Sequence, residues 1–542
     1  MTTRVVHDVP LPSLVSDCCR RLTRYLSLRV DAHGALVDQC GSRVVESSLF
    51  LALLCRMEAS SWRAAAGARV AGCLGRSSGD QGWQALLARA VLGESKAGDR
   101  LLAVSYLRGF DHFTGARKKA LLATLFAVCR VLPYDRRLAG LELPGPEANA
   151  TWTRLVVLAV RVLHGRETGL PPSSVAGDTA ELLRLLHQGS AREVWEGNLL
   201  AHLLALHAVH AVDPGASEVS CGMHVLTARQ NPDGGVPFVE SHDLFLTAKA
   251  GLALVRAGGR RRLMLRIGDY VASGQNPEGG WAFASRVRQC DVDSTAVCVQ
   301  FLRDLDHARY RDQIGRAEQF LRSMAVPGGG LPTYRQGEPP EAEMTAAGLI
   351  VLAPGSRQSD PLLREAVVFL LDQQSGDGTW PQSWTLSESS VIGRAVHALT
   401  CLPPAVAQGL EKRIGRALER AAARLRGTQN KDGGWAQRAG GVSDPISTAH
   451  AVSATHGMKH RDLAYAGTRW LIATERPGGG FHGPADQVGP RPIPYDFPSL
   501  PSIHALTALT DWPRWRDQSP SSMPRVPLEP APAALSRRRE AG

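Results

Sequence analysis

The chain has 542 residues, of which 44% are hydrophobic, 21% are charged and 6% are aromatic. These fractions exclude a chain that is disordered throughout, and the length allows two or three domains with large hydrophobic cores. Lysine and arginine exceed aspartate and glutamate by 62 − 51 = 11 charges, a balance compatible with an anionic substrate, a nucleic acid or a membrane surface.

The distribution of the charges and cysteines narrows these possibilities. The basic residues are scattered, and no zinc-finger or aromatic RNA-binding motif accompanies them, so we expect no nucleic-acid partner. The exceptions to the scatter are Arg117–Lys119, Arg260–Arg262 and Arg537–Arg539. No apolar run reaches the length of a membrane span or a signal peptide, and the ten cysteines contain no C-x-x-C pair. These features predict a reduced, cytoplasmic protein without integral membrane association.

The first part of the chain, to about residue 212, is helical in pattern but lacks a strong repeat. Apolar residues recur at three- and four-residue spacing in segments such as 151–164 and 194–212, which is typical of buried or amphipathic helices. The sequence VDPGAS from Val212 is the predicted junction with the next part.

A glycine-rich element recurs from residue 230 onward, in forms such as QNPDGG, QNPEGGW and QNKDGGW. Two helical stretches separate consecutive elements, so each repeat predicts a helix pair that must stack on its neighbours to bury its apolar face. Periodicity alone allows an open solenoid or a closed double ring. One glycine from each element marks the repeat: Gly235, Gly280, Gly329, Gly378, Gly434 and Gly479.

The aromatic residues of these elements have a structural explanation. A glycine pair permits left-handed backbone at a helix end, and the aromatic residue that follows packs back over the turn. This role accounts for most of them without any contact to a ligand.

Acidic residues mark the start of the first helix in most repeats, and there they cap free N–H groups. A second acid two residues later occurs only at Asp293 and Glu343, and capping does not require it. Two carboxyls crowded at one site retain a proton between them, which makes the pair a Brønsted acid. The pattern does not choose between the aspartate and the glutamate pair. The first acids are Asp243, Asp291, Glu341, Glu388 and Asp444.

Other site chemistries lack their motifs. The sequence contains no HExxH, Walker or G-x-S-x-G pattern, and no Asp-Asp dipeptide from which a D-D-x-x-D magnesium cluster is built. His450 lies on a predicted first-of-pair helix, where a lone histidine is more often packing than catalytic.

The segment DVDSTA (Asp291–Ala296), with QNPEGGWAF just before it and Q-x-x-x-G-x-W-like elements around it, resembles the acid motif of the class II terpene cyclases. This family includes squalene–hopene cyclases and bacterial diterpene and drimenyl diphosphate cyclases, and its motif is D-x-D-D-T-A. The resemblance implies that Asp293 is the general acid, with Asp291 as its neighbouring carboxylate and Thr295 in support. Ser294 departs from the pattern, where the last aspartate of the motif usually stands.

The resemblance also implies an architecture. The expected fold is all-α, with two α/α toroids in the βγ arrangement, so the repeats close into a ring. The implied division is an N-terminal segment 1–25 packing on the β domain, a γ-like domain 26–212, a β-like domain 213–515 and a disordered tail 516–542.

The resemblance further implies an activity, the protonation-initiated cyclisation of a linear prenyl diphosphate that retains its diphosphate. Geranylgeranyl diphosphate is the favoured substrate and farnesyl diphosphate the second, with Mg²⁺ as cofactor although no metal-ligand motif is legible. We expect a monomer or a homodimer. The expected substrate contacts, with the TWPQSW tryptophans ranked first, are Trp380, Trp384, Trp281, Trp435, Tyr334, Lys249 and Arg394.

Three alternatives remain at this point. A squalene-type triterpene cyclase keeps the fold but acts on an uncharged substrate. A non-catalytic toroid scaffold has no substrate, and a protein prenyltransferase subunit requires an Asp/Cys/His zinc set, which the helix starts do not supply.

Overall fold

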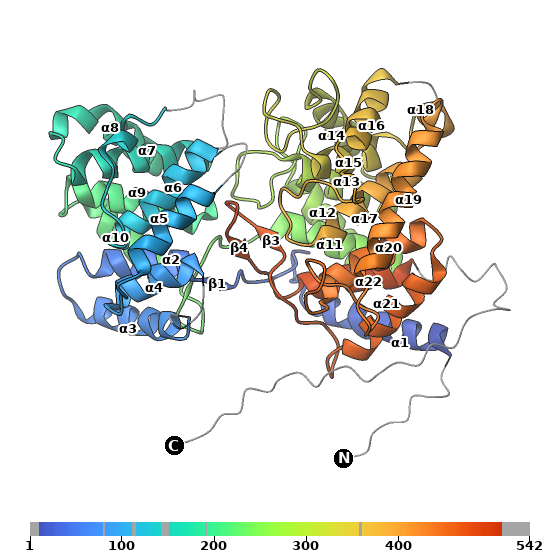
Figure 1. The fold of residues 1–542 in the computed structure, drawn as a ribbon, viewed down its shortest axis with the longest axis horizontal. Coiled ribbons are helices and arrows are strands. Elements are labelled where there is room, and N and C mark those ends of the chain that lie inside the picture. The colour runs from blue at the N-terminus through green and yellow to red at the C-terminus, as the bar shows by residue number, and fades with distance from the viewer. Residues whose placement is uncertain are drawn as a thin grey trace, which may run out of the picture.

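The computed structural model describes residues 10–77, 79, 82–110, 115–142, 151–189, 192–356 and 360–511, and these form two groups of helices (Figure 1). The predicted all-α class is confirmed, because strands in these residues are limited to two short pairs. These are β1 (Ser42–Arg43) with β2 (Val236–Pro237), and β3 (Gln487–Val488) with β4 (Pro494–Tyr495). The predicted tail, 516–542, lies outside the described residues.

Six helices of the repeat region form a closed inner ring. Each packs on the next, and the last packs on the first, which confirms the expected ring and excludes an open solenoid. Their buried faces supply most of the larger hydrophobic core. The inner helices are α11 (Asp243–Arg256), α13 (Val292–Asp306), α15 (Ala342–Leu352), α17 (Glu388–Thr400), α20 (Pro445–Gly457) and α22 (Leu500–Thr510).

The outer helices are amphipathic and cover the inner ring, because only one side of each carries buried apolar residues. The N-terminal helix belongs to this layer, since it contacts α11, α21 and α22. The layer consists of α1 (Leu11–Ser27), α12 (Arg261–Ser273), α14 (Arg311–Ser323), α16 (Pro361–Asp372), α18 (Pro404–Ala407), α19 (Glu411–Thr428) and α21 (Arg461–Thr474).

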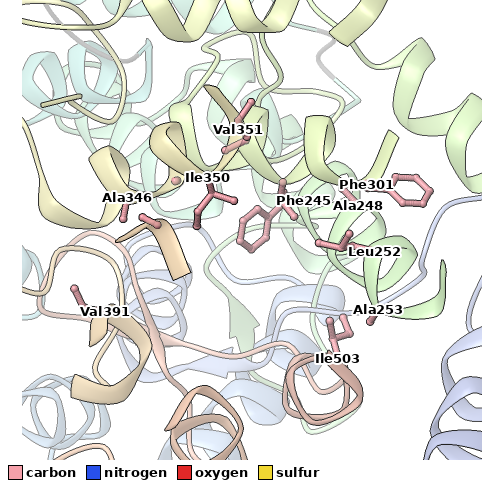
Figure 2. Packing of buried hydrophobic residues seen from close by; sticks show 14 of the residues in the cluster. Phe245, Ala248, Leu252, Ala253, Phe301, Ala346, Ile350, Val351, Val391 and Ile503 are labelled. Atoms are coloured by element: carbon pink, nitrogen blue, oxygen red, sulfur yellow. The ribbon is translucent and has the colours of Figure 1, made fainter. Parts of the chain in front are cut away.

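Side chains from different inner helices meet inside the ring (Figure 2). In that view Phe245 and Leu252 project from α11, Ile350 from α15 and Ile503 from α22. All four are at most 9% exposed, so the ring is held together largely by burial of apolar surface.

The remaining helices form the second group, around α2, α6, α7 and α9. Within this group α7 packs on α6, α8 and α9, and α2 packs on α3, α4, α6 and α9. The members are α2 (Val44–Leu54), α3 (Ser61–Gly75), α4 (Trp83–Leu92), α5 (Asp99–Gly109), α6 (Gly115–Val128), η1 (Arg136–Gly140), α7 (Thr151–Glu167), α8 (Pro172–His187), η2 (Trp195–Gly197), α9 (Leu199–Val212) and α10 (Ser217–Thr227). No helix in the described part of the chain is long and apolar enough to cross a membrane.

The chain passes from one hydrophobic core to the other and back. Packing changes from one core to the other between Cys40 and Val45, and again between Val236 and Val239. Residues after 25 stay with the ring because the Leu36 N–H donates to Thr247 Oγ1 at 2.8 Å. The division at residues 25 and 212 itself stays a prediction.

Three of the six glycine-rich elements are tight turns locked by the tryptophan that follows them. Gly279 has φ 91°, and a Cβ there would lie 2.7 Å from the Arg316 carbonyl oxygen, so only glycine fits. The indole N–H of Trp281, Trp380 and Trp435 donates in each case to a carbonyl ten residues earlier, at 2.7–2.8 Å. The structural explanation of these aromatics therefore holds for these three.

Replacing one of these tryptophans should destabilise the ring. Trp435 is 1% exposed, so Trp435→Ala leaves a cavity and removes the bond from the indole to the Leu425 carbonyl, at a cost of about 3–5 kcal/mol. We expect a lower midpoint of urea unfolding, followed by circular dichroism. Val442→Ala, in the following loop and 91% exposed, should change the stability by less than about 0.5 kcal/mol. Equal effects of the two substitutions would contradict the locking role of the tryptophan.

Candidate active site

A cavity of about 830 Å³ lies between the two groups of helices. One wall comes from α6, α7 and α9, and the other from the inner ring helices. Asp291, Asp293, Glu343, Arg394 and Lys249 all line it. The fold therefore brings the aspartate pair and the glutamate pair, which the sequence treated as alternatives, into one cavity.

Asp291 caps the first turn of α13. One carboxylate oxygen accepts from the Ser294 N–H at 2.6 Å, and the other, Oδ2, is buried without a hydrogen-bond partner in the protein. Burial raises the pKa of this carboxyl to about 7, and the neighbouring charge of Asp293 adds to the increase. A buried carboxyl with a free oxygen is suited to hold a proton near neutral pH.

Asp293 lies on the first turn of the same helix, and its side chain is 21% exposed. Arg394, on α17, donates from Nη1 to Asp293 Oδ1 at 2.8 Å. The ion pair fixes one carboxylate oxygen of Asp293 and leaves the other for the cavity. Arg394 was expected to contact the substrate; it lines the cavity and pairs there with an acid.

Thr295 forms a hydrogen bond with the backbone beside the acids. Its hydroxyl oxygen accepts from the Trp281 N–H at 2.9 Å, and the Asp291 N–H donates to the Trp281 carbonyl at 3.0 Å. These bonds tie the start of α13 to the preceding glycine turn and so position Asp291. Thr295 itself does not line the cavity, so it supports the site from behind.

Glu343 and Asp486 complete the group of acids. Glu343 Oε1 accepts from the Ser383 N–H at 2.8 Å, and its Oε2 is buried without a partner. Asp486 accepts from the Ser387 N–H at 2.8 Å. Burial raises the pKa of both carboxyls, that of Asp486 to about 7.

Lys249 is the second cation of the group. Burial lowers its pKa to about 8 against the opposing effect of Asp293, and its Nζ lies 4.8 Å from the centroid of the Phe245 ring. Asp291, Asp293, Glu343 and Asp486 therefore lie with Lys249 and Arg394 in one part of the cavity. Such a group approaches neutrality by retaining protons, and interacting carboxyls share them as a unit.

Aromatic side chains cover much of the remaining wall. Trp384 and Tyr334 line the cavity as expected. Their rings meet edge to face with centroids 5.7 Å apart, and the indole N–H of Trp384 donates to Thr333 Oγ1 at 2.9 Å. The expectation that Trp281 and Trp380 face the substrate is not met, because neither lines the cavity and both lock glycine turns.

Sequence reasoning missed five other aromatic residues of the wall. Phe283 follows the locking Trp281 by two residues, so its place in the repeat was the available signal. Trp152 comes from α7, outside the repeats, and contacts both Phe283 and Tyr334. The five are Trp152, Phe238, Phe245, Phe283 and Tyr495.

A cationic group lines another part of the cavity, formed by Arg117 and Lys118 of α6 and by Arg491. Burial lowers the pKa of Lys118 to about 7, and the charges of Arg491 and Arg117 contribute. Glu338 and Glu341 line the same part. The basic run 117–119, to which the sequence pattern assigned no role, therefore contributes to the cavity wall.

Sequence comparisons show that this chain is similar to known cyclases. Residues 336–484 match the model of the squalene-hopene cyclase C-terminal domain. The chain is 34% identical to a drimenyl diphosphate synthase from Streptantibioticus cattleyicolor, over 97% of this chain and 99% of that protein. It is 36% identical to a drimenyl diphosphate synthase from Streptomyces showdoensis, over 91% of this chain and 93% of the relative.

The fold is similar to a solved structure. The ent-copalyl diphosphate synthase from Streptomyces platensis superimposes with a TM-score of 0.53, covering 92% of this chain and 98% of that one. The two sequences are 17% identical, so this comparison concerns the fold alone.

The raised pKa of Asp291 predicts how stability depends on pH. The folded state holds a proton on this carboxyl up to about pH 7, whereas the unfolded chain releases it near pH 4. Asp291 therefore contributes stability below pH 4 that is lost as pH rises through 7. Asp291→Asn keeps the helix cap and removes the titration, so its stability should fall less between pH 5 and pH 7.

Urea unfolding at several pH values measures this difference. The slope of the unfolding free energy against pH should differ between the wild type and Asp291→Asn by up to one proton, which is about 1.4 kcal/mol per pH unit. Parallel profiles for the wild type and Asp291→Asn would show that Asp291 holds no proton in the folded state.

Proposed function

The chain belongs to the class II terpene cyclases, and on this premise we propose that it cyclises a linear prenyl diphosphate by protonation and leaves the diphosphate on the product. The observation that carries the proposal is the position of Asp293. It lies at the cavity surface, beside buried carboxyls whose pKa values are raised, and the same cavity has an aromatic wall and a cationic region.

The reaction starts at Asp293. Its carboxyl O–H bond breaks, the proton adds to the terminal double bond of the substrate, and a carbocation forms at the neighbouring carbon. Arg394 holds Asp293 Oδ1, which orients the other oxygen toward the cavity. Asp291 is the neighbouring carboxyl that shares the proton of the pair.

The aromatic wall guides the cation. Attack by the internal double bonds on successive cationic carbons closes the rings, and the faces of Trp384, Tyr334 and Phe283 stabilise the charge by about 0.5–2 kcal/mol each. A substrate that fills the cavity displaces water from it, so the rings close before a solvent molecule captures the cation. Loss of a proton from carbon ends the reaction.

The cationic region binds the diphosphate. Arg117, Lys118 and Arg491 supply positive charge on both sides of the cavity, since α6 belongs to one group of helices and Arg491 to the segment beside the ring. Burial strengthens their attraction to phosphate oxygens. A squalene-type substrate carries no charge for them to bind, which favours a diphosphate.

Mg²⁺ fits this region as a partner of the diphosphate. The described residues contain no group of three or more His, Cys, Asp or Glu side chains able to hold a metal alone. Magnesium commonly needs only one or two carboxylates in addition to substrate phosphates, and the charges of Glu338 and Glu341 act on each other at this place. These two glutamates would hold the ion, which when bound neutralises phosphate charge.

The relatives guide the choice of substrate length. Both proteins that match over most of the chain are named drimenyl diphosphate synthases, and the drimenyl skeleton contains one farnesyl unit. We therefore place farnesyl diphosphate ahead of geranylgeranyl diphosphate, which reverses the expectation from the sequence. Incubation with each diphosphate, phosphatase treatment and mass spectrometry of the alcohols tests this order. Cyclic product from geranylgeranyl diphosphate alone would overturn it.

Replacement of the acid should slow cyclisation strongly. Asp293→Asn removes the proton donor at nearly unchanged shape, so kcat should fall by about 10²–10⁴-fold, the usual contribution of a general acid. The matched control is Asp360→Asn, because Asp360 caps α16 as Asp291 caps α13 and lies outside the cavity. The control should retain wild-type activity. Undiminished cyclisation by Asp293→Asn would refute the assignment.

Loss of one cation should weaken substrate binding. Lys118→Met removes a charge from the cationic region at similar length, and we expect KM for the diphosphate to rise about tenfold with a smaller change in kcat. Lys119→Met is the matched control, since Lys119 is exposed and does not line the cavity. An equal KM in the two variants would place the diphosphate elsewhere.

A further inference from the structure

A short segment of chain, which we call the strap, lies between the two groups of helices. The strap comprises residues 487–495, that is β3, β4 and the turn that joins them (Figure 1). Ile493 is 1% exposed and packs in the core of the second group, whereas Tyr495 packs in the core of the ring. The strap therefore contacts both groups. Its residues that line the cavity are Gln487, Gly489, Pro490, Arg491 and Tyr495.

Backbone hydrogen bonds shape the strap and attach it to the ring. The Val488 N–H donates to the Trp384 carbonyl at 3.1 Å. At the tip, the Gly489 N–H donates to the Ile493 carbonyl and the Ile493 N–H to the Pro490 carbonyl, both at 2.9 Å. Arg491 lies inside this tip, so the position of its guanidinium in the cationic region depends on where the tip is held.

Arg43 of β1 holds the tip from the other side. It lies where the chain passes from the ring to the second group, and its Nη1 donates to the Gly489 carbonyl at 2.6 Å and to the Ile493 carbonyl at 3.4 Å. The guanidinium carbon of Arg43 also lies 4.2 Å from the centroid of the Phe238 ring, which lines the cavity. One side chain thus contacts both the strap and the cavity wall behind it.

Glu46 fixes the direction of the Arg43 guanidinium. Arg43 Nε donates to Glu46 Oε2 at 2.7 Å, and Nη2 donates to Glu46 Oε1, so the pair is bidentate. Both residues are buried, at 5% and 0% exposure. A buried ion pair is seldom more stabilising than apolar residues of the same volume. This pair is better explained by what it orients, because it leaves Nη1 directed at the strap.

We propose that Arg43 is a positioning residue for the diphosphate site: it holds the tip of the strap and so sets the place of Arg491. Arg43 does not itself line the cavity, so it acts through the strap. Arg491 faces the same cavity as Arg117 and Lys118 of α6, and one diphosphate can contact cations of both groups only if the strap is correctly placed. The inference rests on the proposed function and adds to it the residue that orders its cationic region.

Removing the ion pair should weaken substrate binding through Arg491. Arg43→Gln combined with Glu46→Gln leaves no buried charge unpaired, and we expect KM to rise about tenfold with a smaller change in kcat. Adding Arg491→Gln should raise KM no further than Arg491→Gln does alone, because an absent cation cannot be misplaced. Adding Lys118→Met should multiply the two effects, as for independent contacts. The substrate is the prenyl diphosphate that the wild type converts.

The matched control is a second buried arginine pair, in Arg89→Gln combined with Asp99→Asn. Arg89 and Asp99 are 7% and 5% exposed, and their bonds are bidentate, Nε to Oδ2 at 3.0 Å and Nη2 to Oδ1 at 2.6 Å. Neither residue lines the cavity. This variant loses a comparable ion pair, so it should lose stability but keep the wild-type KM.

Hydrogen exchange gives a readout that needs no substrate. The amides of Gly489 and Ile493 should exchange at least about tenfold faster in the variant without the Arg43–Glu46 pair, since the tip then opens more often. Exchange at these amides should match the wild type in the control. Arg43→Lys keeps the charge and one donor but not the bidentate geometry. Its KM and exchange should lie between those of the wild type and the double variant, and it replaces the double variant if that chain does not fold.

Three results would overturn the proposal. These are a wild-type KM in the variants of Arg43, KM effects that multiply when Arg491→Gln is added, and unchanged exchange at the tip of the strap. An equal rise of KM in the control would likewise assign the effect to lost stability. Absence of product from the wild type with any prenyl diphosphate would instead overturn the proposed function, whereas the exchange measurement would still show whether Arg43 holds the strap.

Discussion

The burial of charged groups at the centre of the ring is the constraint on which the rest of the structure depends. Carboxyls and cations removed from water are costly unless they pair, bond to backbone N–H groups or hold protons. Asp293 pairs with Arg394, whereas Asp291 and Glu343 each bond to a backbone N–H and keep one oxygen without a partner. This arrangement keeps a proton in a place that an apolar substrate can reach.

The toroid makes that arrangement possible because it supplies many helix starts at one end of a rigid ring. Two of the inner helices, α13 and α20, begin with an aspartate whose side chain caps the first turn, and glycine turns precede both helices. Trp281 and Thr295 show the coupling directly, since one backbone bond and one hydroxyl bond connect the turn to the acid-bearing helix. One of the repeated units, the one that contains α13, thus carries the catalytic aspartates.

The sequence predicted the ring and its acids better than the cavity wall. Glycine spacing and the paired acids are local patterns, so the helix pairs and both acid pairs were legible. The closed ring and the choice of Asp293 came from the family resemblance. The wall is assembled from segments distant in sequence, so Trp152 and Arg491 gave no local signal. The prediction for Trp380 was wrong for a physical reason. The same glycine-aromatic pattern also occurs where the aromatic ring locks a turn. Only the direction of the ring distinguishes that role from contact with a substrate.

The central claim is that cyclisation starts with a proton from the enzyme and leaves the diphosphate in place. The most direct measurement is the reaction of the wild-type protein with farnesyl diphosphate in D₂O, analysed by mass spectrometry of the intact product. The account predicts a cyclic diphosphate that carries one deuterium on carbon, with no release of inorganic pyrophosphate. A cyclic product without deuterium, formed together with pyrophosphate, would contradict it.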